Sequence, residues 1–196
     1  MEYNKELSDE QVGAIGRGIE LGRILQTIEL EQLDVKYIPS GNIVDTGTLG
    51  PCTGVIIHNS QKKEAYAGHF VDSELDGLED MVKSAISKFH NLNQLDVYVA
   101  GNSVNPVLFD DDYVKYALQD RKFIPDLLKK YGFLDSKVHI RWSPLITSDL
   151  VSCDAHLWLD VDSAENELEV TENSYHKHHF HRTVYKDDIK NAPNPF

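Results

Sequence analysis

The stretch TGVIIHNSQKKEAYAGHF, residues 53–70, predicts a β-hairpin. Residues 53–58 and 64–69 are runs rich in apolar and β-branched side chains, and residues 59–63 (Asn-Ser-Gln-Lys-Lys) form a polar connection between them. Two such runs joined by a few polar residues usually pair as antiparallel neighbours. We therefore expect two paired strands near the centre of the chain.

The flanking sequence predicts further strands, bounded by Gly, Pro, Asn or Asp. These strands are expected at residues 33–38, 42–46, 95–100, 138–142, 155–161, 167–171 and 178–185.

Three regions have helical character. A capping box at Ser8 to Gln11 begins a helix over about residues 8–29. Residues 72–90 place apolar side chains at helical spacing, with Asp72 or Ser73 as the N-cap. Residues 110–131 are also helical, but Pro125 is expected to divide them into two short helices.

The order of these elements predicts one α+β domain over residues 1–196, a mostly antiparallel β-sandwich flanked by helices. A length of 196 residues suits one domain, and 41% hydrophobic residues suit a folded chain. The tail, residues 190–196, is expected to fray.

Charge and targeting signals narrow the function classes. The chain has 19 Lys and Arg against 32 Asp and Glu, a net charge of −13, so neither nucleic acid nor an anionic membrane is an expected partner. No signal peptide and no long apolar segment is readable, which predicts a cytoplasmic protein with reduced thiols. Two cysteines make neither a disulfide framework nor a zinc site.

The residues that suggest chemistry are Cys52, directly before the first hairpin strand, and His69, at the end of the second. A hairpin makes these positions cross-strand neighbours, and directly opposed Cβ atoms lie roughly 4.5–5.5 Å apart. An imidazole at that distance stabilises a thiolate and can protonate a leaving amine. Thr46 is placed to hold the imidazole in one tautomer, and the turn with Gly47 and Gly50 can present backbone N–H groups to an oxyanion.

This pattern resembles a known family. Thr-x-x-Leu-Gly-x-Cys, a short apolar strand, and Gly-His seventeen residues after the cysteine are similar to the CheD chemoreceptor glutamine deamidases. Those share a fold with the catalytic domain of cytotoxic necrotizing factor and with Burkholderia lethal factor.

The resemblance implies a nucleophilic Cys52, a His69 base and a Thr46 orienter on a sandwich of that family's type. It implies hydrolysis of a glutamine side chain of a target protein to glutamate, with no cofactor or metal. It also admits a toxin or secreted effector that acts in a host cytosol. Pro51 has no N–H, so the N–H of Cys52 and a turn amide would hold the oxyanion.

Alternatives remain open for this stretch. The same residues could carry transglutamination or hydrolysis of an N-terminal asparagine, and Thr48 is a rival for the role of Thr46. Cys52 could instead be a buried structural thiol in a non-catalytic protein-binding module.

Other residues carry weaker hypotheses. Asn102, after the strand at residues 95–100, is a candidate substrate-binding residue. Cys153 is read as part of the core. The cluster at residues 176–181, with four histidines, is read as an exposed strand that gains charge below about pH 6.5 rather than as a zinc site. The acidic run at residues 110–112 is read as a helix cap.

Overall fold

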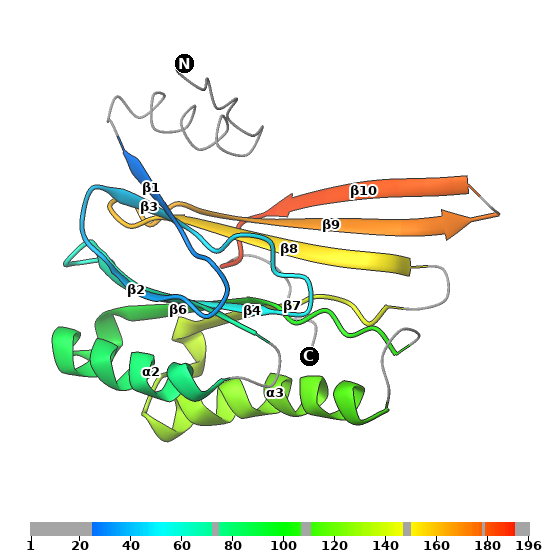
Figure 1. Ribbon diagram of the computed structural model, residues 1–196. Coiled ribbons are helices and arrows are strands. Elements are labelled where there is room, and N and C mark those ends of the chain that lie inside the picture. Colours follow the sequence, from blue (N-terminus) through cyan, green and yellow to red (C-terminus); the bar gives the residue numbers. More distant parts are fainter. Residues whose placement is uncertain (1–24, 72–74, 107–110, 147–149, 178, 191–196) are drawn as a thin grey trace, which may run out of the picture.

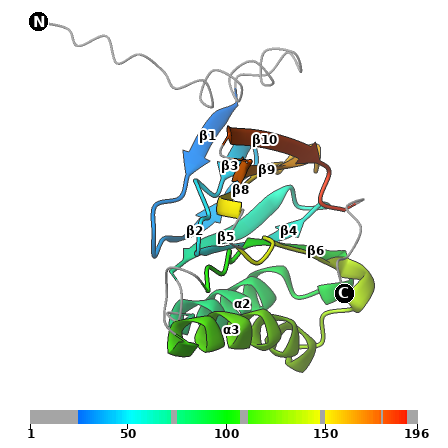
Figure 2. The same cartoon turned by 90° about the vertical axis from the view of Figure 1, so that its right-hand side faces the viewer.

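The computed structural model describes residues 25–71, 75–106, 111–146, 150–177 and 179–190. These residues form three layers, in which two five-stranded sheets face each other and two helices cover the second sheet (Figure 1). The expected α+β sandwich is therefore confirmed. The two described helices lie on one side of it only (Figure 2).

Sheet A has the strand order β1-β3-β8-β9-β10. β1 pairs with β3 in parallel, and the other neighbours are antiparallel. The strands are β1 (Gln26–Glu29), β3 (Asn42–Asp45), β8 (Leu150–Asp160), β9 (Asn166–His176) and β10 (His179–Asp187).

Sheet B has the strand order β2-β5-β4-β6-β7 and contains the expected hairpin, β4 with β5. β6 and β7 pair in parallel, and the remaining neighbours are antiparallel. The strands are β2 (Val35–Ile38), β4 (Thr53–Asn59), β5 (Glu64–Phe70), β6 (Leu95–Gly101) and β7 (Val138–Trp142).

Two helices, α2 (Asp76–Phe89) and α3 (Asp111–Lys130), pack on the outer face of sheet B. Short 3-10 turns, η1 (Leu92–Gln94) and η2 (Asp135–Lys137), precede β6 and β7. In the described part of the chain, no helix combines the length and the apolar character needed to cross a membrane.

The alternation of side chains along β4 produces two cores. Ile56 joins the core between the two sheets, whereas Val55 and Ile57 join the core under the helices. Because both faces of β4 are covered, all seven of its residues are buried.

The hairpin is tighter than expected. Asn59 belongs to β4 and pairs with Glu64, so the connection is four residues, 60–63, rather than five. The Asn59 side chain accepts hydrogen bonds from the backbone N–H groups of Gln61 and Lys62, at 3.1 and 2.9 Å. This side-chain turn sets the register of the pair.

Two helix boundaries differ from the expectation. The helix over residues 8–29 is wrong at its C-terminal end, where Gln26–Glu29 forms β1, because pairing with β3 outweighs the helical spacing. Residues 8–24 lie outside the described residues. α2 begins at Asp76 after Leu75, not after Asp72 or Ser73, which are also outside them.

Pro125 does not divide α3, which runs without interruption through it. An interior proline costs about 3 kcal/mol. Ile124, Leu127 and Leu128 around it are buried against sheet B, at roughly 1.5–3 kcal/mol each, which offsets that cost. The expected tail falls on residues 191–196, outside the described part, apart from Lys190.

Candidate functional site

The loop from Thr46 to Cys52 bonds to both sheets. Its first half follows β3 and bonds to β8 of sheet A. Thr46 N–H donates to Leu157 O at 3.1 Å, and Leu49 N–H donates to Ala155 O at 2.8 Å. The loop therefore runs alongside β8 before it enters β4.

The second half of the loop is fixed to the end of β6. Asn102 N–H donates to Cys52 O at 2.7 Å, and Ser103 N–H donates to Gly50 O at 2.9 Å. Gly101, with φ +99°, makes this contact possible, because a Cβ there would lie 2.3 Å from Cys52 O. The backbone of Cys52 is held in place by residues about fifty positions away in the sequence.

Cys52 and His69 lie on the same face of the hairpin but are not directly opposed. His69 pairs with Gly54, and the first pair of the ladder is Thr53 with Phe70. The side chains of Cys52 and His69 therefore both face sheet A, as diagonal neighbours. Diagonal positions lie about 7–8 Å apart, and this register places Cys52 opposite position 71, two residues from His69, so the expected direct opposition is wrong.

The backbone of His69 is bonded on the side of β2. Its N–H donates to Asp34 O at 2.9 Å, and its carbonyl accepts from Leu33 N–H at 2.8 Å. The side chain is 3% exposed. Within the described residues, neither ring nitrogen has a hydrogen-bond partner of normal geometry. A buried imidazole without such a partner is uncommon in folded proteins and marks a position where a ligand or a reacting group can bind.

The surroundings of His69 favour a neutral ring. Burial lowers the pKa of His69, and the backbone oxygens of Thr46 and Leu30 with the charge of Asp34 oppose that effect only in part. The turn at Gly47 packs over the ring, where a Cβ on Gly47 would lie 3.8 Å from Nδ1. A neutral imidazole can accept a proton, which is what a general base requires.

Cys52 is 3% exposed, and its thiol contacts Gln32. The Nε2 atom of Gln32 lies 4.0 Å from Sγ, within the range of a weak hydrogen bond to sulfur. Gln32 is itself an exposed residue in the turn before β2. An exposed residue thus contacts the thiol, and its side-chain amide can donate to a thiolate or an oxyanion.

Thr46 is completely buried, and its hydroxyl is committed to the backbone. Oγ1 donates to Gly47 O and accepts from Leu157 N–H, both at 3.1 Å. The hydroxyl therefore holds the loop, and the backbone oxygen of Thr46 is the group that acts on His69. Thr48, the rival, is exposed.

Asp45 fixes the Gly47 turn from the other side. Its carboxylate accepts from Gly47 N–H at 2.8 Å and from Trp158 Nε1 at 2.6 Å, and it contacts His156 Nε2. The side chains of Asp45, His156 and Trp158 are all buried. These residues join β3 to β8 directly behind the loop.

Asn102 is buried and serves as a link between β6 and α3. Its Oδ1 accepts from Arg121 Nε at 2.9 Å, and its carbonyl accepts from Arg121 Nη2 at 2.5 Å. Asn102 therefore contacts the backbone of Cys52 on one side and a guanidinium on the other. Its role in substrate binding stays a prediction.

The second cysteine belongs to the same core between the sheets. Cys153 is buried on β8, and burial raises the pKa of its thiol to about 12. Such a thiol is inert at neutral pH, which fits the expectation of a core residue.

The other candidate clusters are described only in part, because His178 lies outside the described residues. His176 pairs with His179 at the end of the β9–β10 ribbon, and the rings of His176 and His181 are 6.5 Å apart. In the ranges that the structure describes, no group of three or more His, Cys, Asp or Glu residues could hold a metal ion. Asp111 and Asp112 lie in the first turn of α3, and Asp110 is outside these ranges.

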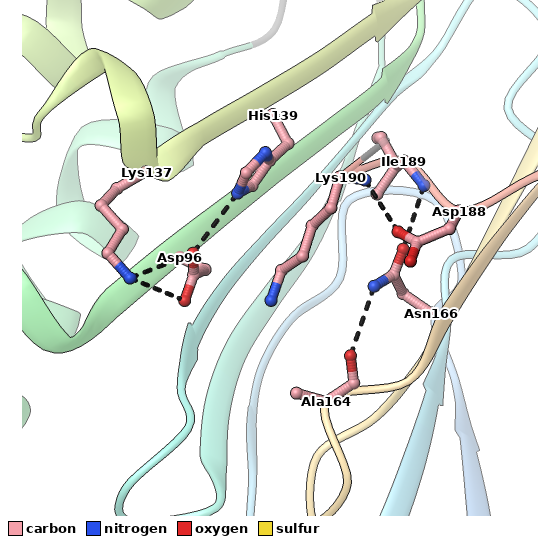
Figure 3. Close-up of polar contacts among 8 residues, drawn as sticks. All are labelled: Asp96, Lys137, His139, Ala164, Asn166, Asp188, Ile189 and Lys190. Atoms are coloured by element: carbon pink, nitrogen blue, oxygen red, sulfur yellow. Dashed lines mark hydrogen bonds and ion pairs between the residues drawn. The ribbon is translucent and has the colours of Figure 1, made fainter. Parts of the chain in front are cut away.

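A second polar cluster lies at the opposite end of β4 and β6 (Figure 3). Asp96 pairs with Lys137 and His139, each at 3.3 Å. Burial alone would raise the pKa of Asp96, but His139, Lys190 and Lys137 outweigh it and lower the pKa to about 2. The neighbouring backbone of Ile189 donates to Asn166 Oδ1 at 3.0 Å. The cluster holds the end of the sandwich together.

Comparison with known proteins gives little likeness in sequence. No protein-family model matches the chain, and no match was found among the curated proteins. Among solved structures, the hypothetical protein YfiH of Bacillus licheniformis matches with a TM-score of 0.42 and 13% identity, over 57% of this chain and 51% of YfiH. The match thus spans about half the length of YfiH.

A second structure, the Neisseria meningitidis protein NMB0706, described as DUF152, matches with a TM-score of 0.43 and 10% identity over 74% of both chains. The names of these two proteins state no reaction, and at such low scores no activity is taken from them.

These matches do not support the family expected from the sequence. The resemblance to CheD, necrotizing factor and Burkholderia lethal factor is wrong, and the structures similar to this chain include YfiH and a DUF152 protein. The expected deamidation of a protein glutamine and the role as toxin or effector are wrong with it. The shared signal was short, about 25 residues around Cys52 and His69, and a motif of that length does not fix a family.

Proposed function

We propose that the chain is an enzyme whose reactive group is the thiol of Cys52, with His69 as its general base. The observation that carries this proposal is the buried imidazole of His69, which lacks a normal hydrogen-bond partner among the described residues and lies on the same face of the hairpin as Cys52. The class of reaction is nucleophilic catalysis at an electrophilic carbon.

The chemistry follows from the surroundings of the two side chains. His69, neutral because burial lowers its pKa, accepts the thiol proton as Cys52 attacks the substrate. The amide of Gln32 donates to the charge that develops, and the imidazolium then returns its proton to the leaving group. Since the two positions are diagonal, the substrate or one water bridges them in the first step.

The burial of Cys52 is compatible with access. Gln32, whose amide contacts Sγ, is an exposed side chain with a large conformational freedom. We expect rotation of this side chain to open a path to the thiol. The backbone of Cys52 stays fixed by Asn102 while it does so.

Alkylation kinetics test the proposal. In a Cys153→Ala background, iodoacetamide should modify Cys52 with a pH midpoint below about 8.5, the value of an unperturbed thiol. His69→Ala should slow this reaction at pH 7 by at least about tenfold, because it removes the base. His179→Ala, at an exposed position of β10, is the matched control and should leave the rate unchanged.

A carbonyl probe tests catalysis itself. p-Nitrophenyl acetate should give a burst of one p-nitrophenol per chain, which Cys52→Ala abolishes and Cys153→Ala keeps. If Cys52 alkylates no faster than a denatured cysteine and the burst does not depend on it, the thiol is structural and the proposal fails.

A further inference from the structure

A groove of about 690 Å³ opens between α3 and β7, on the helix side of sheet B. Its walls include Leu118, Pro125, Ile140, Trp142 and Leu145. The volume lies in the range of small-molecule sites, roughly 300–1,000 Å³, and such sites are mostly apolar with a few polar groups. The groove is separate from the proposed reactive face, because Cys52 faces sheet A.

One charged group sits in this apolar wall. Arg121 lines the groove, and its guanidinium lies 5.8 Å from the ring centre of Trp142. Burial lowers the pKa of Arg121 to about 10, a sign that its charge is removed from water.

Arg121 has no carboxylate partner among the described residues. Its Nε and Nη2 donate to Asn102 Oδ1, Asn102 O and Ser143 O, which are all uncharged acceptors. No hydrogen bond of the described residues uses Nη1. A half-buried cation held only by neutral acceptors keeps a strong preference for an anion.

The rim of the groove is balanced in charge, so that Arg121 makes the lining positive. Lys122 and Lys129 lie on it, against Asp126 and Asp135, so with Arg121 the lining holds three cations and two carboxylates. The chain as a whole has a net charge of −13. A locally positive groove on an acidic protein favours an anionic ligand there over the rest of the surface.

We propose that this groove binds a small organic carboxylate, with its apolar body against Leu118, Ile140 and Leu145 and its carboxylate on Nη1 of Arg121. Arginine is the side chain best suited to carboxylate recognition, and its charge makes the hydrogen bond about twice as strong as a neutral one. Trp142 forms the remaining wall, and its fluorescence should report the binding. The site does not depend on the reactivity of Cys52.

Titration of the full chain with three ligands of equal apolar length tests the proposal. Calorimetry at pH 7 with octanoate, 1-octanol and octyl phosphate should show octanoate binding at least tenfold more tightly than 1-octanol, and at least as tightly as octyl phosphate. Tryptophan fluorescence should change with the same midpoint. Equal affinity for octanoate and 1-octanol, or tighter binding of octyl phosphate, overturns the assignment of a carboxylate.

Three variants test where the ligand binds. Arg121→Gln should remove the preference for octanoate over 1-octanol, whereas Lys115→Gln, the same charge change on the exposed side of α3, should keep it. Leu145→Trp, at an exposed position of the wall, should fill the groove and weaken both ligands at least tenfold without disturbing the core. Unchanged binding in Leu145→Trp overturns the location, even if Arg121→Gln does not fold.

Discussion

Replacing Gly101 by alanine should destabilise the sandwich where the reactive loop joins it. Gly101 has φ +99°, and a Cβ on it would lie 2.3 Å from Cys52 O and 2.9 Å from Leu49 Cβ. A left-handed conformation costs an L residue about 1–2 kcal/mol. Overpacking in a filled interior costs about 1–3 kcal/mol more. The free energy of unfolding should therefore fall by about 2–5 kcal/mol.

Gly41→Ala is the matched control for this change. Gly41 has φ +84°, and nothing lies within 4 Å of the Cβ that alanine would add. Its cost should be that of the backbone alone, about 1–2 kcal/mol. The difference between the two variants thus isolates the clash with Cys52 and Leu49.

Urea unfolding measured by tryptophan fluorescence gives both free energies, since the chain has two tryptophans. The rate of Cys52 alkylation in the Gly101→Ala protein supplies a second readout. That rate should change because the Asn102 N–H···O Cys52 bond of 2.7 Å cannot survive the clash. If Gly101→Ala is no more destabilising than Gly41→Ala, the close packing of the loop on β6 is refuted.

Three further changes test other parts of the structure. Asp96→Asn should lower the free energy of unfolding by about 2.5 kcal/mol at pH 7, since a pKa lowered from 3.8 to about 2 is worth about 1.4 kcal/mol per unit. This stabilisation is present above about pH 4 and lost as the pH falls towards 2, so a difference from the parent protein that persists at pH 2 would contradict it. Cys153, with a pKa of about 12, should resist alkylation of the native protein up to pH 9, as peptide mass spectrometry can show; fast modification would contradict its burial. Asp45→Ala should cost about 2–4 kcal/mol in urea unfolding, because two buried side chains and the N–H of Gly47 lose their acceptor, whereas Asp45→Asn, which still accepts from Gly47 N–H, should cost less; equal costs would argue against that bond.

The local part of the fold was predictable from the sequence, because the hairpin and α2 are encoded by periodicity within a few residues. The strands expected at residues 95–100 and 138–142 were also found, as short apolar runs between turns. β1 was not, since its only support is a parallel partner, β3, and nothing in its own spacing distinguishes it from a helix.

The site was predictable only in outline. Cys52 and His69 were placed on one hairpin, but the observed register pairs His69 with Gly54 and makes the two residues diagonal neighbours. Gln32 and Arg121 were missed, because their partners lie 20 and 19 positions away and meet them only through sheet pairing and the docking of α3. Asp45 and His156 are 111 positions apart, and no local signal joins them.

The loop of residues 46–52, bonded to β8 at its start and to the end of β6 at its finish, makes the two sheets one cooperative unit at this end. Separating that loop from either sheet exposes part of the shared core, so its amide protons should exchange only when the sandwich opens globally. Hydrogen exchange would then assign Leu49 and Asn102 the same opening free energy as the central strands. A molecule that reaches Cys52 under native conditions is therefore expected to enter by movement of a side chain rather than by local opening of the backbone.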